Sequence, residues 1–345
     1  MEATRDKNPT LRIGDRLLGV GQPVWIIAEI GINHEGSAET CARMIEAAAA
    51  ADADAVKLQT IDADENYMRG TASHSLFSRC ALTREETARM FDLSRSLGVA
   101  PFTTAGDFAT LEWVDRLAPA AHKISSGLMT HLPLIRQAAR TGRPMLMSTG
   151  MAGMEQIDQS VAVAREAGVS ALGLFHCVSL YPAPPETLNL AAIRALEARY
   201  GLPVGWSDHC LNADAAFLSV ASGACMIEKH FTFDTRRPSF DHGISLDPRG
   251  LADMVARVRA AEAMLGRPDR PLTAEEEAKA ARMHRILVAR RPVAAGEELT
   301  VENLGLKRPL DGVSGLPPAA WEATLGRRVR QALAVDEAVT AQVLQ

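Results

Sequence analysis

The stretch Met226-Ile227-Glu228-Lys229-His230 decides the fold, because it is a short apolar run that ends in three charged or ligand-capable side chains. Upstream, Gly205-Trp206-Ser207-Asp208-His209 repeats the arrangement, so two strand-like runs each end in a histidine. In a barrel of parallel strands, residues at the carboxyl ends of the strands point into the active site. Two imidazoles on neighbouring strand ends can share one metal ion and leave coordination positions open for substrate or water.

Each histidine also has a purely structural explanation, in which one caps a turn and the other is satisfied in the core. For either histidine alone that explanation is the more common one. Because His209 and His230 recur at the same place in a repeated strand–loop–helix register, we interpret them together as a metal site.

The same strand–loop–helix rhythm runs through most of the chain. Strands are predicted over 25–29, 55–59, 99–104, 122–126, 144–148, 172–176, 203–207 and 225–230. Helices are predicted over 38–51, after the capping box Thr83-Arg84-Glu85-Glu86, and over 108–117, 133–141, 154–167, 190–200, 213–222 and 248–265. Nearly continuous apolar runs are typical of parallel strands buried on both faces. Eight such units in about 250 residues predict an α/β TIM (β/α)8 barrel.

The pattern of apolar, polar and proline residues divides the chain into three parts. Residues 1–265 form the barrel domain, with a short opening hairpin within 10–24 and a long polar insert over 60–83. Residues 266–282 are polar and proline-rich and read as a linker with some helix. Residues 283–345 alternate apolar and polar side chains and form a small second domain. At about 60 residues it is marginal alone, so we expect it to dock on the barrel or on a partner.

Composition places the chain among globular proteins, with 47% apolar and 23% charged residues. The formal net charge of −5 argues against a nucleic-acid surface, which is normally basic. No apolar run approaches the ~18 residues of a membrane span, and the N-terminus lacks the apolar core of a secretory signal. The five cysteines form no CxxC pair and are expected to be reduced and mostly buried. These features predict a cytoplasmic protein without nucleic-acid or membrane partners.

The last residues of the predicted strands form a coherent polar set, which the opposite face of a barrel would not need. In chain order they are Glu29, Lys57, Gln59, Thr104, Lys123, Ser126, Ser148, His176, Ser179 beyond it, Ser207, His209, Glu228, Lys229 and His230.

Two lysines of this set, Lys57 and Lys123, emerge from otherwise apolar strands. A buried lysine is costly unless it is paired. One explanation is that each pairs with a carboxylate such as Glu29. The functional explanation is that the two cations, with the hydroxyls of Ser126 and Ser148, grip phosphate and carboxylate. A Schiff-base lysine is a third option, but a metal held by two histidines is usually an alternative to it.

Two loops above the expected barrel mouth carry further candidates. The segment 235–243, TRRPSFDHG, follows the eighth strand and is either a solvated charge run or a source of Asp241 for a polar substrate. Ser179-Leu180-Tyr181-Pro182 follows the sixth strand, and Tyr181 has equal reason to pack or to contact a ligand.

The motifs together resemble the sialic acid (N-acetylneuraminate) synthases. The resemblance rests on IAEIGINHEG (27–36), VKLQT (56–60), HKISSG (122–127), MSTGM (147–151), HCVSLYPAP (176–184), GWSDH (205–209) and IEKHF (227–231). The second domain, with KRPLDG (307–312), is similar to their antifreeze-like, or SAF, domain of the β-clip type. Seven motifs in order over nearly the whole chain make the resemblance specific.

The resemblance implies a metal-assisted condensation of phosphoenolpyruvate with an N-acyl hexosamine, giving a nine-carbon 2-keto acid and phosphate. It implies that a divalent cation, Mn²⁺ or Mg²⁺, is held by His209 and His230. By the same analogy, Lys57, Lys123, Ser126, Ser148 and Ser207 contact phosphoenolpyruvate. The residues implied around the sugar and metal are Glu29, Gln59, Thr104, Tyr181 and Asp241, and Ser179 is a further substrate-binding candidate.

The resemblance also implies a head-to-tail, domain-swapped homodimer in which Arg308 of one chain reaches the sugar's N-acyl group in the partner's barrel. Two departures from the family pattern bear on the acceptor. Leu128 stands where a glutamate is usual, and Thr103-Thr104-Ala105-Gly106 stands where Ser-Thr-Pro-Phe is usual. The phosphoenolpyruvate half is intact, so the acceptor is either N-acetylmannosamine or a deoxy or diacylated relative, which would lead to legionaminic, pseudaminic or another nonulosonic acid.

Two other functions compete with this one. A relative that makes eight-carbon keto acids by the same chemistry is disfavoured by the SAF-like tail. A non-catalytic barrel that binds a sugar or carboxylate as a scaffold is supported by Leu128 alone. Because a scaffold does not need Lys57, Lys123, His209 and His230 together, the enzyme is the favoured interpretation.

Overall fold

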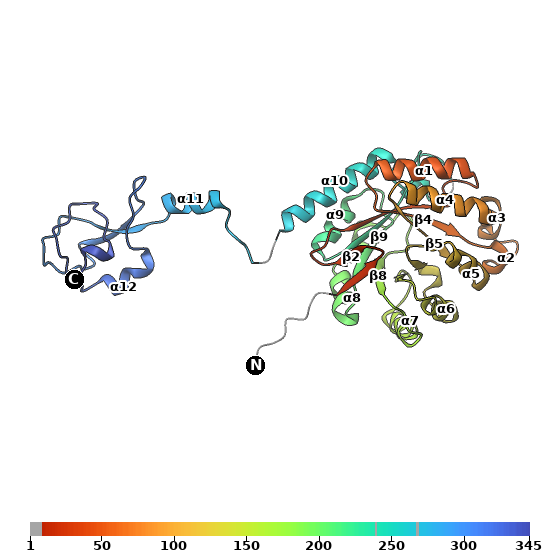
Figure 1. Ribbon diagram of the computed structural model, residues 1–345, viewed down its shortest axis with the longest axis horizontal. Coiled ribbons are helices and arrows are strands. Elements are labelled where there is room, and N and C mark those ends of the chain that lie inside the picture. Colours follow the sequence, from red (N-terminus) through yellow and green to blue (C-terminus); the bar gives the residue numbers. More distant parts are fainter. Residues whose placement is uncertain (1–8, 239, 267–268) are drawn as a thin grey trace. The chain divides into compact units, whose positions relative to one another are not determined.

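The computed structural model describes residues 9–238, 240–266 and 269–345, as two compact units, one ending at Gly266 and one running to Gln345 (Figure 1). We describe each unit by itself. The expectations that concern residues 1–8, Ser239 of the loop over 235–243, and residues 267–268 of the linker lie outside the described residues.

The first unit is a closed barrel of eight parallel strands in the order β10-β3-β4-β5-β6-β7-β8-β9, which confirms the predicted fold. Its strands are β3 (Trp25–Gly31), β4 (Ala55–Thr60), β5 (Ala100–Ala105), β6 (His122–Ile124), β7 (Met145–Ser148), β8 (Leu172–Cys177), β9 (Val204–Asp208) and β10 (Met226–His230). Most of their residues are buried, because helices cover the outside of the barrel and side chains fill its inside.

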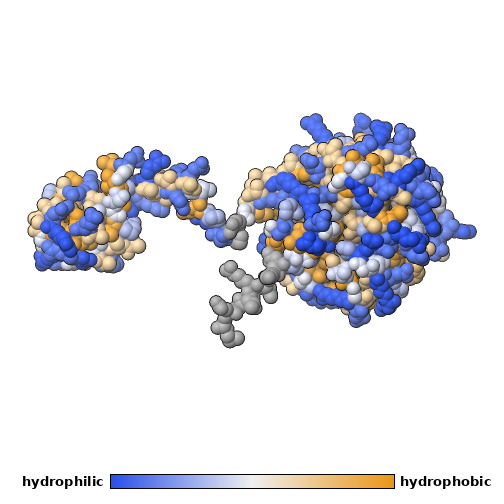
Figure 2. All heavy atoms as spheres, viewed as in Figure 1, coloured by the Kyte–Doolittle hydropathy of each residue, from blue (hydrophilic) through white to orange (hydrophobic). Residues whose placement is uncertain are grey.

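The helices of the ring follow the strands as predicted, within one or two residues at each end. They are α1 (Ala38–Ala50), α4 (Arg84–Ser96), α5 (Phe108–Arg116), α6 (Leu132–Arg140), α7 (Met154–Glu166), α8 (Ala192–Tyr200), α9 (Asp214–Ala221) and α10 (Pro248–Leu265). The expected capping box is formed, since Thr83 accepts from the Glu86 amide and Glu86 accepts from the Thr83 amide. Hydrophilic residues cover much of the outer face of the ring (Figure 2).

A β-hairpin closes the barrel at the end where the strands begin. Strands β1 (Thr10–Ile13) and β2 (Arg16–Gly19) pair antiparallel and place Leu11 and Leu18 in one cluster with the strand-start residues Trp25 and Ala55. Because this end is plugged by apolar side chains, a polar site is left to the opposite end, where the strands finish.

The insert after β4, for which the sequence predicts only a long polar segment, contains two helices. They are α2 (Ala63–Asn66) and α3 (Ala72–Cys80), capped by Asp62 and Thr71 respectively. The described part of this unit also contains the short 3-10 turns η1 (Ser126–Leu128), η2 (Pro185–Thr187) and η3 (His242–Ile244). All five cysteines are free and buried, as expected.

The second unit has its own apolar core, which includes Leu287, Val293, Leu299, Leu304 and Val329. It contains α11 (Ala274–Met283), the antiparallel strands β11 (Ile286–Ala289) and β12 (Leu304–Lys307), η4 (Pro318–Ala320), α12 (Trp321–Thr324) and η5 (Ala341–Val343). Among the described residues, no helix has both the length and the hydropathy needed to cross a bilayer.

Candidate active site

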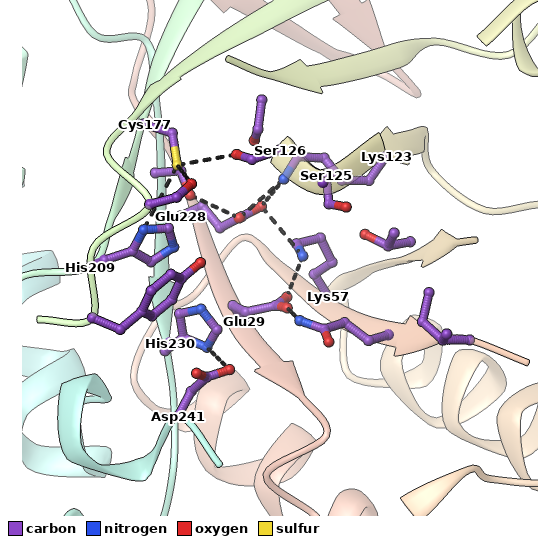
Figure 3. Close-up of a pocket in the computed structure, with 18 of the residues that line it drawn as sticks. Glu29, Lys57, Lys123, Ser125, Ser126, Cys177, His209, Glu228, His230 and Asp241 are labelled. Carbon is purple, nitrogen blue, oxygen red and sulfur yellow. Dashed lines mark hydrogen bonds and ion pairs between the residues drawn. The ribbon is translucent and has the colours of Figure 1, made fainter. Parts of the chain in front are cut away.

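A cavity of about 300 Å³ opens at the carboxyl ends of the barrel strands (Figure 3). The residues given a role in the sequence analysis of the barrel line it, namely Glu29, Lys57, Gln59, Thr104, Lys123, Ser126, Ser148, Ser179, Tyr181, Ser207, His209, His230 and Asp241. Two residues of the strand-end set, His176 and Lys229, do not line it, because His176 Nε2 lies 2.8 Å from the Leu188 carbonyl oxygen and Lys229 contacts Cys210. Arg308 belongs to the second unit and is exposed directly after β12.

Two buried lysines and two buried glutamates form the floor of this cavity. Lys57 Nζ lies 2.7 Å from Glu29 Oε2 and 3.8 Å from Glu228 Oε2. Lys123 Nζ donates to both oxygens of Glu228, at 3.1 and 2.9 Å. The carboxylate pairing expected for a buried lysine is therefore present at this site. The cluster is charge-matched, so an incoming anion must exchange with the glutamates for the two ammonium groups.

The pKa values of the two glutamates are shifted in opposite directions. Burial raises the pKa of Glu29 to about 7, although Lys57 beside it acts the other way. Burial also opposes ionisation of Glu228, but Lys123 and Lys57 outweigh it and lower the pKa of Glu228 to about 2. Glu228 thus stays an anion that holds both lysines, while Glu29 is poised to gain or lose a proton near neutral pH.

The histidines lie across the cavity from the lysines, with their ring centroids 5.5 Å apart (Figure 3). His209 Nδ1 is 2.8 Å from the carbonyl oxygen of Val178, which can only accept, so Nδ1 carries the proton and the lone pair is on Nε2. Burial, with His209 and the nearby lysines, holds the pKa of His230 well below its usual range. His230 is therefore suited to act as a neutral ligand. Burial acts in the same direction on His209, but its contacts with Cys177 and the Val178 carbonyl outweigh burial and raise the pKa of His209.

A divalent cation fits these residues. His230 Nδ1 is buried without a hydrogen-bond partner, and Asp241 Oδ2 lies 3.6 Å from it. In the described ranges no cluster of three or more His, Cys, Asp or Glu side chains has metal-binding geometry. His209 and His230 would supply two imidazoles, with Asp241 beside His230, and the other coordination positions would be open to substrate and solvent.

Asp241 is positioned by a network between the loops that follow β3 and β10. Its amide donates to Asn33 Oδ1 at 3.3 Å, and its carbonyl accepts from Ser245 Oγ at 2.7 Å. Glu35 accepts from Arg237 at 2.7 Å and lies 3.0 Å from His242 Nε2. The loop is therefore tied to the barrel through Arg237, Asp241 and His242, although residues 235–238 are exposed, and Asp241 lines the cavity.

The insert supplies a wall that sequence reasoning missed. Tyr67 and Phe77 line the cavity with their rings stacked, the centroids 5.2 Å apart, and Ile61 and Met151 add apolar surface. On the histidine side, the Tyr181 ring lies 4.2 Å from that of His209. The two insert helices are short, and the few apolar residues in this polar stretch do not recur with a helical period. The sequence pattern therefore could not reveal the helices or the aromatic pair.

Two further lining residues were not selected from the sequence. Glu228 belongs to the strand-end set, but the sequence alone assigns it no role. Its position as a charged residue at the end of an apolar strand is the signal that could have identified it. Cys177 Sγ lies 3.5 Å from Ser126 Oγ and 3.7 Å from His209 Nδ1. As an isolated cysteine in an apolar run, it gave no signal beyond burial.

The two departures from the expected family pattern have different settings. A Cβ added at Gly106 would stand 2.1 Å from Asn66 Oδ1, so the insert fills the place where a larger side chain is usual. Leu128 is half-buried against the core of the helical ring and is not among the residues that line the cavity. Its effect on the acceptor stays a prediction.

Comparison with known proteins adds independent information. Residues 44–270 match the NeuB family and residues 284–345 match the SAF domain. The chain is 32% identical to the spore coat polysaccharide biosynthesis protein SpsE of Bacillus subtilis, over 95% of each chain. It is 31% identical to the N,N'-diacetyllegionaminic acid synthase of Legionella pneumophila, over 86% of this chain and 88% of that one.

A solved structure shares the fold. The N-acetylneuraminic acid (sialic acid) synthetase of Leptospira borgpetersenii, crystallised with citrate, is 30% identical with a TM-score of 0.75. The match covers 79% of this chain and 95% of that one.

Proposed function

The chain belongs to the NeuB family, and we propose that it condenses phosphoenolpyruvate with an N-acyl hexosamine to give a nine-carbon 2-keto sugar acid and phosphate. The observation that carries the proposal is the pairing of two buried lysines with two buried glutamates, opposite two buried histidines, in one strand-end cavity. Such a charged set in a barrel interior is costly for stability alone.

The phosphoenolpyruvate half of the cavity is the lysine side. Lys57 and Lys123 bind its phosphate and carboxylate, with the hydroxyls of Ser126, Ser148 and Ser207. Ser148 Oγ is buried without a hydrogen-bond partner in the structure, so it is free to donate a hydrogen bond to a ligand oxygen. The lysines hold the negative charge that ends on the departing phosphate.

The acceptor lies between the histidines and the mouth. Gln59, Thr104, Ser179, Tyr181 and Asp241 offer it polar atoms, and Tyr67 and Phe77 offer ring faces. Thr104 Oγ1 is a second buried hydroxyl without a partner. His209 and His230 hold Mn²⁺ or Mg²⁺, which when bound polarises the aldehyde oxygen.

The reaction forms one carbon–carbon bond and breaks one carbon–oxygen bond. The enol carbon C3 attacks the aldehyde carbon, and the aldehyde oxygen takes up a proton. Water then adds to the oxocarbenium carbon C2 and gives up one proton. The new C2 hydroxyl loses its remaining proton and becomes the ketone as the C–O bond to the bridging oxygen breaks and phosphate leaves with that oxygen. Glu29, whose pKa is near 7, is the group placed to hold a proton in this space.

Two of the three relatives named above are synthases of diacetyllegionaminic acid and sialic acid, which supports N-acetylmannosamine or a deoxy or diacylated relative as the acceptor. Pseudaminic or another nonulosonic acid is the alternative product, and a non-catalytic sugar-binding barrel is the alternative function. We also propose that the enzyme is cytoplasmic and forms a domain-swapped homodimer, in which Arg308 of the SAF domain reaches the partner's sugar.

A substrate panel tests the proposal. Purified protein with Mn²⁺, phosphoenolpyruvate and each of several N-acyl hexosamines should release phosphate only when a sugar is present. His209→Ala, folded as judged by circular dichroism, should release none. Phosphate release by no member of the panel would favour the scaffold, and full activity of the enzyme in a strong chelator would exclude the metal.

A further inference from the structure

Lys229 and Asp208 form a buried ion pair on the outside of the barrel wall, behind the histidines. Side chains alternate along a strand, so Glu228 and His230 face the cavity whereas Lys229 between them faces the helices. On β9, Ser207 faces the cavity and Asp208 faces outward. Lys229 and Asp208 are both 0% exposed, and neither lines the cavity.

The pair ties together the two backbone segments that carry the histidines. Lys229 Nζ donates to the carbonyl oxygen of Cys210 at 2.5 Å and lies 3.5 Å from Asp208 Oδ1. The same Oδ1 accepts from the Cys210 amide at 2.8 Å, which closes a tight turn around His209. One ammonium, adjacent in sequence to His230, therefore holds the residues on both sides of His209.

This arrangement is expensive if stability is its only role. A buried ion pair can often be replaced by apolar side chains of similar volume with no loss of stability. Here, moreover, Asp208 Oδ2 is buried without a hydrogen-bond partner in the described structure. Groups behind metal ligands commonly fix the ligands' orientation, and altering them weakens metal binding about 10–100-fold.

We propose that Lys229 and Asp208 are positioning residues that set the distance and orientation of the two metal-binding imidazoles. The inference rests on the proposed role of His209 and His230 as metal ligands. It assigns a function to a charged pair that touches neither substrate nor metal.

The test is Mn²⁺ affinity, measured by calorimetry on the full chain without substrates. The double variant Lys229→Met, Asp208→Asn removes both charges and leaves no uncompensated one, and it should bind Mn²⁺ at least tenfold more weakly. Asp208→Asn alone keeps the bond from Lys229 to Cys210 and should show a smaller loss. Lys229→Gln with Asp208→Asn, which also removes both charges, serves as the test if the first double variant does not fold.

A matched control lies at the other end of the barrel. Asp54 is a mostly buried carboxylate paired with Arg16 at 2.5 Å and Arg259 at 3.1 Å. Asp54→Asn should lower the Tm and leave Mn²⁺ affinity unchanged. Unchanged affinity in the Asp208 and Lys229 variants, or an equal loss in the control, would overturn the inference. If the wild-type chain bound no Mn²⁺, the metal assignment itself would fall, whereas phosphate release would still report on the condensation.

Discussion

At the scale of single residues, we expect the two lysines and two glutamates of the cavity floor to determine what the site binds. Glu228 is shared by Lys123, at 2.9 Å, and Lys57, at 3.8 Å, so removing one lysine leaves a buried carboxylate only partly compensated. Losing one partner of a buried pair costs about 3–5 kcal/mol. A test of binding must therefore neutralise both members of a pair.

For Lys123→Met combined with Glu228→Gln, we expect the KM for phosphoenolpyruvate to rise roughly tenfold to a hundredfold, since one charge-assisted contact of ~1.5–3 kcal/mol is lost. The KM for the sugar should change much less. Steady-state phosphate release with each substrate varied in turn measures both constants. The matched control is Arg116→Met with Glu112→Gln, an exposed pair on α5 at 2.8 Å, which should change neither. A rise confined to the sugar's KM would contradict the assignment.

Glu29 predicts a pH dependence of stability in the ligand-free protein. Its folded pKa of about 7 lies above the ordinary value of 4.5, so between these values the folded state holds more protons than the unfolded state. Its contribution is therefore fully present below pH 4.5, falls as pH rises, and is lost above about 7.

Glu29→Gln removes this dependence, since the neutral amide needs no proton. Whatever its value at pH 4.5, the free energy of unfolding of the variant minus that of wild type should increase from pH 4.5 to 7 and then level off. Urea unfolding at several pH values measures it. A difference that stayed constant over this range would show that Glu29 titrates normally.

At the scale of elements, the insert between β4 and α4 lines the cavity with the stacked rings of Tyr67 and Phe77, which we propose contact the acceptor. We expect Tyr67→Ala to raise the KM for the sugar roughly threefold to tenfold, corresponding to the ~0.5–1.5 kcal/mol of an aromatic contact. The KM for phosphoenolpyruvate should not move, and Tyr67→Phe should behave as wild type. An equal rise in the KM of both substrates would show that the two rings do not contact the sugar specifically.

The elements differ in how well the sequence predicts them, for physical reasons. The barrel strands were predictable because burial on both faces requires long apolar runs, and α4 because Thr83 and Glu86 form a capping box. The position of the cavity was predictable because polar residues stand at the ends of these apolar strands. Helices α2 and α3 were not predictable, because they are short and their apolar residues have no helical period. The outward direction of Lys229 required the register of β9 against β10.

At the scale of the whole molecule, the proposed action of Arg308 on the partner's site predicts complementation. His209→Ala and Arg308→Ala chains, each inactive, are mixed and allowed to exchange subunits. If Arg308 acts on the partner's site, a mixed dimer has one site with both lesions and one with neither, so activity returns. If it acts within its own chain, every site carries one lesion. A mixture that stays inactive after demonstrated exchange would refute the arrangement.

The central claim is that one cavity joins phosphoenolpyruvate to a sugar aldehyde and breaks the C–O bond to phosphate. The most direct measurement uses phosphoenolpyruvate labelled with ¹⁸O at the bridging oxygen, together with the best acceptor of the panel, and mass spectrometry of both products. The account predicts a nine-carbon keto acid without the label and phosphate that carries it. Unlabelled phosphate would mean P–O cleavage, and the absence of a nine-carbon acid would mean that the barrel does not catalyse the condensation.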